Sequence, residues 1–139
     1  MSGIMKSLAH SRWYCIYHLV FIPKYRRKTI YGEIREHLKE IFHDLARQKG
    51  CRVIEGHLMK DHVHMCLEIP PKYAVSSIVG FLKGKSALAL ARIINQRDKN
   101  FIGEHFWAKG YCVSTVGFEL ATVQKYIREQ ETADKEGRF

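Results

Sequence analysis

Two strand-like segments joined by only two residues constrain the fold of this chain more than any other feature. Residues 51–59 and 62–69 are rich in apolar and β-branched residues, and Pro70-Pro71 ends the second segment. A connection as short as Lys60-Asp61 lets the chain reverse its direction but leaves no room for a crossover. The sequence therefore predicts an antiparallel β-hairpin in the middle of the chain.

The other expected elements follow from the spacing of apolar residues. Residues 12–22 and 111–116 are expected as strands, and residues 34–50, 75–95 and 118–133 as helices. The order strand, helix, strand, strand, helix, strand is that of a split β-α-β sheet, an arrangement that RNA-recognition domains share. The fold class is therefore predicted as α+β, with a ferredoxin-like (RRM-like) antiparallel sheet and helices packed on one face.

The length and composition fit one compact domain that binds a polyanion. With 46% hydrophobic residues, residues 1–139 can form a single domain with its own core. The 23 Lys and Arg against 14 Asp and Glu favour nucleic acid as the partner, with an acidic membrane surface second. The four cysteines include no C-x-x-C pair, so they are expected to be reduced, mostly packed thiols. No apolar run approaches the roughly 18 residues of a membrane span, and a cytoplasmic location is expected.

Two histidines lie one residue apart in the second strand of the predicted hairpin. Side chains alternate between the two faces of a strand, so His62 and His64 emerge together on the face opposite Val63. Two neighbouring imidazoles suit the binding of one divalent cation, which can polarise a phosphoryl oxygen. One His-x-His is a weak metal signal, and a pair of surface or hydrogen-bonded histidines is the alternative. His57 could face the same site, although a structural role is the favoured interpretation for it.

The last predicted helix carries a tyrosine and a glutamine at the border of its apolar face. Leu120, Val123 and Ile127 form the stripe that is expected to face the core. Tyr126 and Gln130 are four residues apart, so they project from neighbouring turns and could address one site together. A tyrosine at such a border more often only packs, so the spacing alone leaves both interpretations open.

Basic residues gather at two places that could contact nucleic acid. Tyr25 lies within the first group and offers a ring on which a base could stack. A merely solvated basic face is the alternative. The candidate DNA-binding residues are Lys24, Arg26, Arg27 and Lys28 after the first predicted strand, and Lys83 and Lys85 on the second predicted helix.

Eight short blocks of sequence, spread between about residue 6 and residue 135, occur in the order typical of a known family. The blocks are SLAHSRW (7–13), VFIPKYRR (20–27), DHVH (61–64), IPPK (69–72), FLKGKS (81–86), FW (106–107), GYCVSTVG (110–117) and YI (126–127). Together they resemble the single-tyrosine transposases of the IS200/IS605 insertion sequences, which belong to the HUH endonucleases.

The resemblance implies an HUH endonuclease fold and a strand transfer on single-stranded DNA with a hairpin at the element ends. Tyr126 matches the family's nucleophile, which attacks a backbone phosphate to give a 5′-phosphotyrosine and a free 3′-hydroxyl. His62 and His64 match the metal-binding histidines, and Gln130 matches the polar residue that completes the site for Mg²⁺ or Mn²⁺. The family also implies a homodimer in which the last helix reaches across, and the sequence is compatible with Tyr126 from either subunit.

A non-catalytic nucleic-acid-binding module of the RNA-recognition type, repressing its own expression, is the alternative function. Both functions agree with the positive charge and with the predicted fold. The two functions differ at Tyr126. A protein that only binds nucleic acid does not need a phenol near two histidines, with Gln130 one helical turn away. A replication-initiator nuclease of the HUH class is disfavoured because its longer tyrosine-lysine motif is absent. The sequence therefore favours the transposase.

Overall fold

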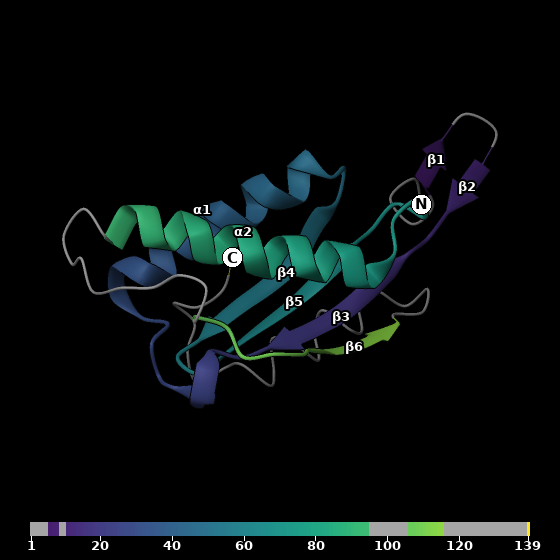
Figure 1. Cartoon of the computed structure of the whole chain (residues 1–139). Coiled ribbons are helices and arrows are strands. Elements are labelled where there is room, and N and C mark those ends of the chain that lie inside the picture. Colours follow the sequence, from purple (N-terminus) through teal and green to yellow (C-terminus); the bar gives the residue numbers. More distant parts are fainter. Residues whose placement is uncertain (1–5, 9–10, 95–105, 116–138) are drawn as a thin grey trace.

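A four-stranded antiparallel sheet forms the centre of the molecule (Figure 1). The computed structural model describes residues 6–8, 11–94, 106–115 and 139. The sheet has the order β4-β5-β3-β6, and every neighbouring pair is antiparallel. Its strands are β3 (Ile16–Phe21), β4 (Arg52–Met59), β5 (His62–Glu68) and β6 (Cys112–Thr115). The predicted hairpin is confirmed as β4 and β5, and β3 and β5 are the two central strands.

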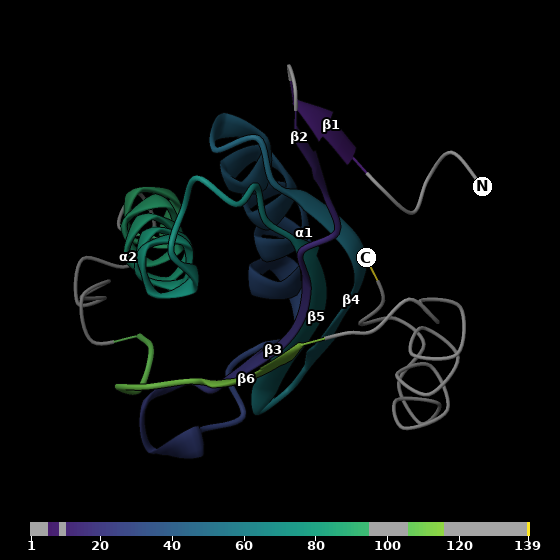
Figure 2. The same cartoon turned by 90° about the vertical axis from the view of Figure 1, so that its right-hand side faces the viewer.

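Two helices, α1 (Gly32–Gln48) and α2 (Val75–Ile94), cover the same face of this sheet (Figure 2). The core lies between the two layers, and its fully buried side chains include Leu19 on β3, Met65 on β5 and Phe42 on α1. This arrangement confirms the predicted α+β fold class. The helix expected over residues 118–133 lies outside the described residues. Among those that are described, no helix is long and apolar enough to cross a membrane.

Helix α1 ends in a glycine motif that turns the chain directly into β4. Gly50 has a φ of +67°, a backbone conformation that glycine adopts without strain. Its N–H donates to the Arg47 carbonyl (3.0 Å), and the Cys51 N–H donates to the Ala46 carbonyl (2.9 Å). These are the two hydrogen bonds of a Schellman motif, which satisfy the last carbonyls of a helix. Gly50 thus ends the helix as its sequence position predicts.

The strand that was expected over residues 12–22 is divided into two strands. Strand β2 (Ser11–Trp13) leaves the sheet and pairs with β1 (Lys6–Leu8), whereas β3 begins only at Ile16. The ladder between β3 and β5 ends just before Pro70, which has no N–H to donate. The Ile69 N–H still donates to the Cys15 carbonyl (2.9 Å), and the residues before Cys15 leave this side of the sheet. The β1–β2 hairpin projects beyond the end of the sheet (Figure 1).

Candidate metal and nucleic-acid site

His62 and His64 lie side by side on the face of the sheet that α1 and α2 leave uncovered. Their ring centroids are 4.8 Å apart, with the ring planes at 65° to each other. Val63 and Met65, which alternate with them on β5, are fully buried in the core. The shared face that strand alternation predicted is therefore confirmed. Both imidazoles are partly exposed, and the His62 side chain retains 21% of its accessible surface.

A third histidine, His18, extends this group from the neighbouring central strand. In the register between β3 and β5, Val20 lies opposite His64 and His18 lies opposite Cys66. The His18 and His64 rings make an edge contact with centroids 5.1 Å apart. The sequence shows that His18 alternates with Leu19, but the register that brings it beside His64 depends on pairing between distant strands. His18 was therefore missed as a member of the candidate site.

Asp61 contacts His62 directly, a role that the sequence alone does not predict for it. Its Oδ1 lies 2.7 Å from His62 Nδ1, and its Oδ2 lies 3.2 Å from Arg26 Nε. The hydrogen bond with His62 holds the pKa of Asp61 below its usual value, and the charges of His62 and Arg26 act in the same direction against partial burial. The carboxylate therefore stays ionised at neutral pH and links the basic turn to the first histidine.

The two imidazoles fit a divalent cation as two of its ligands, and the remaining ligands must come from elsewhere. Within residues 6–8, 11–94, 106–115 and 139, no group of three or more His, Cys, Asp or Glu side chains is arranged to hold a metal. Two histidines with open positions resemble a catalytic metal site more than a closed structural one. Tyr126 and Gln130, predicted as nucleophile and further ligand, both lie outside the described residues.

Deeper in the same face, β4 and β5 contribute polar groups that are almost fully buried. His57 is 3% exposed, and its Nε2 lies 3.6 Å from Glu55 Oε1. Cys66 is fully buried, and burial, followed by the nearby Glu55 charge, raises the pKa of its thiol to about 12. Cys66 is therefore a protonated, packed thiol at neutral pH. The burial of His57 agrees with the structural role that its sequence position favoured.

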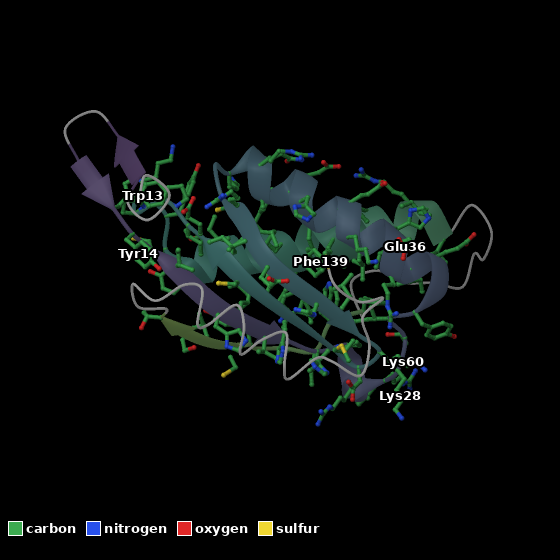
Figure 3. All side chains as sticks on the ribbon, turned by 180° about the vertical axis from the view of Figure 1, so that it is seen from behind. Trp13, Tyr14, Lys28, Glu36, Lys60 and Phe139 are labelled. Carbon is green, nitrogen blue, oxygen red and sulfur yellow. The ribbon has the colours of Figure 1, made fainter. Side chains whose placement is uncertain are left out.

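The basic turn after β3 folds into a short 3-10 helix, η1 (Lys24–Arg26), beside the histidines. Tyr25 and Arg26 have φ values of 60° and 50°, a left-handed conformation that costs about 1–2 kcal/mol for each such residue. Tyr25 is 76% exposed, and the charged groups of Lys24 and Arg27 lie 5.7 Å and 5.4 Å from its ring centroid. The turn thus presents an aromatic ring among cations, as single-stranded nucleic acid prefers. Lys28 lies near Lys60 at the same end of the sheet (Figure 3).

The segment that precedes β6 holds this turn in place. Pro23 pairs with Trp107, and the Lys24 N–H donates to the Phe106 carbonyl at 2.8 Å. Trp107 is buried against Phe21 (ring centroids 4.8 Å apart), and its Nε1 donates to Ser86 Oγ on α2 at 2.9 Å. The basic turn is therefore anchored to the core.

The two lysines of α2 occupy different environments. Lys83 Nζ donates to the carbonyls of Ala108 (2.7 Å) and Gly110 (2.8 Å), and burial lowers its pKa. It therefore ties α2 to the segment before β6. Lys85 is exposed and lines a pocket between α1 and α2, on the side of the sheet away from the histidines. Contact of either lysine with DNA stays a prediction, and only the turn at residues 24–28 lies beside the candidate metal site.

Sequence comparisons identify the family to which the chain belongs. A family model described as transposase IS200-like matches residues 11–130. The chain is 47% identical over 135 residues to the transposase for insertion sequence element IS200 of Salmonella typhimurium, a match that covers 97% of this chain and 89% of the relative. It is 39% identical over 121 residues to the ISDra2 transposase TnpA of Deinococcus radiodurans, covering 86% and 85%.

Solved structures with the same fold extend the comparison. A crystal structure of a transposase-like protein from Deinococcus radiodurans R1 matches with a TM-score of 0.71 and 32% identity, over 91% of this chain and 98% of that one. A REP-associated tyrosine transposase bound to a REP hairpin matches with a TM-score of 0.65 over 91% and 74% of the two chains. Its identity is 12%, so this second likeness shows the fold alone. The family match over most of the chain, supported by these relatives, shows that the protein belongs to the IS200-like transposases.

Proposed function

We propose that this transposase binds the single-stranded ends of its insertion sequence and cuts them through Tyr126, with Mg²⁺ or Mn²⁺ held by His62, His64 and Gln130. The side-by-side placement of His62 and His64 on the face of the sheet away from α1 and α2 carries this proposal. The pair offers two nitrogen ligands and leaves positions open for phosphate oxygens. The match of 97% of the chain to the IS200 transposase supports this class of reaction.

In the proposed reaction, the Tyr126 hydroxyl loses its proton and its oxygen attacks a backbone phosphorus. The new O–P bond gives a 5′-phosphotyrosine, the bond from phosphorus to the 3′-oxygen breaks, and that oxygen leaves as a 3′-hydroxyl. The cation would polarise a phosphoryl oxygen and align the phosphate. The covalent link conserves the energy of the phosphodiester, so a second 3′-hydroxyl can displace Tyr126 and complete strand transfer.

We propose that the turn at residues 24–28 guides the DNA strand toward the histidines. Arg27 and Lys28 supply exposed positive charge there, and the exposed ring of Tyr25 offers a surface on which a base can stack. A DNA hairpin is the ligand class to use in testing this interaction, because the REP-associated relative was solved with a REP hairpin. Lys83 and Lys85 extend the proposed DNA-binding surface to α2.

The function is tested with single-stranded DNA that carries the hairpin and flanking sequence of the element ends. Wild-type protein should cleave this DNA when Mn²⁺ is added and not when EDTA is present. His64→Ala should lose cleavage but keep most of its DNA affinity, because phosphate contacts elsewhere supply binding. Cleavage by His64→Ala at the wild-type rate would remove the metal site from the mechanism. DNA binding without any cleavage by the wild-type protein would favour the non-catalytic binding module.

We further propose that the active form is a homodimer, and the same assay can show which subunit supplies the tyrosine. Tyr126→Phe and His64→Ala proteins should each be inactive alone. If Tyr126 acts on the metal site of the partner subunit, a mixed dimer has one intact site and cleavage returns in part. If each site is built from one subunit, every site in the mixture carries a defect and the mixture stays inactive. A tagged pull-down first confirms that the subunits exchange.

A further inference from the structure

The contact between Asp61 and His62 determines which nitrogen of the imidazole carries the proton. Asp61 Oδ1 lies 2.7 Å from His62 Nδ1, within the range of a charge-assisted hydrogen bond. An ionised carboxylate can only accept hydrogen bonds, so Nδ1 must be the donor. In the neutral ring the lone pair is then on Nε2, and this is the nitrogen that can bind a cation.

The second oxygen of the same carboxylate is engaged from another part of the chain. Arg26 Nε lies 3.2 Å from Asp61 Oδ2. This ion pair alone would hold the carboxylate weakly, because the Arg26 side chain is 65% exposed. The backbone strengthens the arrangement, since the left-handed residues of η1 and the pairing of Pro23 with Trp107 fix where Arg26 leaves the chain. Asp61 is therefore oriented from two sides.

We propose that Asp61, braced by Arg26, is a positioning residue that holds His62 in the tautomer whose Nε2 faces the metal. Hydrogen bonds from carboxylates to metal-binding histidines orient the ring and make the ligand nitrogen more basic. The inference rests on the proposed function, because it takes His62 as a metal ligand. It also couples the turn that is proposed to contact DNA to the metal site through one arginine.

An aspartate that served only the β4–β5 turn would act differently. Such a residue bonds only to its own backbone. Asp61 also makes a hydrogen bond to its own backbone, but in addition each of its carboxylate oxygens contacts a side chain, that of His62 or Arg26. Lys60, the other residue of the turn, has an exposed side chain and provides a matched control. Lys60→Ala should leave both the His62 tautomer and metal binding unchanged, while Asp61→Ala should alter both.

The first measurement is ¹⁵N NMR of the histidine rings in metal-free protein, above the pH at which imidazoles titrate. The His62 signals are assigned by their loss in His62→Gln. Wild-type protein and Lys60→Ala should show His62 with its proton on Nδ1, and Asp61→Ala should show the proton moving toward Nε2. A wild-type His62 with its proton on Nε2 overturns the inference, even if Asp61→Ala fails to fold.

The second measurement is Mn²⁺ affinity by titration calorimetry. Asp61→Ala should bind Mn²⁺ about 10- to 100-fold more weakly than wild-type protein, and Arg26→Ala should show a smaller loss in the same direction. Unchanged affinity in Asp61→Ala, together with lost cleavage in His64→Ala, would overturn the role of Asp61 and leave the proposed function standing. Wild-type cleavage by His64→Ala would remove the proposed function and this inference together, whatever the tautomer of His62.

Discussion

Lys83 has a structural role that its charge alone does not reveal. The sequence places it among the candidate DNA contacts, but its ammonium group donates to two backbone carbonyls of the segment before β6. That segment pairs with the basic turn, so Lys83 helps to hold the turn in place without lying in the candidate site itself. Its neighbour Lys85 makes no such hydrogen bond within the described part of the chain and is exposed.

Replacing each lysine by methionine separates these two roles, because methionine keeps an apolar stem and removes the charge. Lys83→Met should lower the free energy of unfolding by about 1.5–3 kcal/mol, the contribution of a hydrogen bond from a charged donor. Lys85→Met should change it by less than about 0.5 kcal/mol. Urea denaturation followed by circular dichroism measures both values. Equal stability of the two variants, with DNA affinity reduced in both, would return Lys83 to a direct DNA contact.

Residues within one strand were easier to predict than residues that meet across strands. His62 and His64 share a face because strand side chains alternate, and the sequence alone was enough to predict this. His18 and Arg26 reach the same site only through strand register and a left-handed turn, and neither leaves a local signal in the sequence. The predicted partners Tyr126 and Gln130 stay predictions, since they lie outside the described residues.

At the scale of elements, the first two helices and the β4–β5 hairpin were predicted closely, and the N-terminal strand was not. Apolar residues at helical spacing located α1 and α2, and Gly50 marked the end of α1. The division between β2 and β3 depends instead on where β5 stops pairing, which involves Pro70, more than fifty residues away. The β1–β2 hairpin consists of strands of three residues, too short for alternation to reveal.

Phe139 packs on the outer strand β4, at a position that is open because Gly56 has no side chain. Its N–H donates to the Gly56 carbonyl at 2.8 Å, and its ring stacks on Phe42 with centroids 6.1 Å apart. A Cβ atom at Gly56 would lie 2.3 Å from Phe139 Cζ, closer than two carbon atoms can approach. The ring would have to leave its position if Gly56 carried a side chain.

We therefore expect Gly56→Ala and Phe139→Ala to lower stability through the same lost contact. Each should reduce the free energy of unfolding by about 1–2 kcal/mol, and the double variant should cost little more than one of them alone. Gly80→Ala on α2 is the control, because nothing lies within 4 Å of the added atom and alanine favours a helix by about 0.5–1 kcal/mol. Additive losses in the thermal unfolding of the double variant would show that Gly56 and Phe139 act independently.

At the scale of the whole molecule, the two faces of the sheet have different tasks. One face carries the apolar core under α1 and α2, and the other carries the histidines, with the basic turn at its end. The formal net charge of +9 adds a long-range attraction for DNA that weakens as salt rises. The apolar core under the helices thus supports the strands that carry the candidate site.

The central claim, that Tyr126 forms the covalent link to DNA, can be tested by locating that link directly. Wild-type protein is incubated with single-stranded element ends and Mn²⁺, digested, and the DNA-linked peptide is identified by mass spectrometry. The link should map to Tyr126, Tyr126→Phe should form no adduct while unfolding at the same temperature, and the exposed Tyr111→Phe should form as much adduct as wild-type protein. A wild-type level of adduct with Tyr126→Phe, or a link at any other residue, would contradict the account.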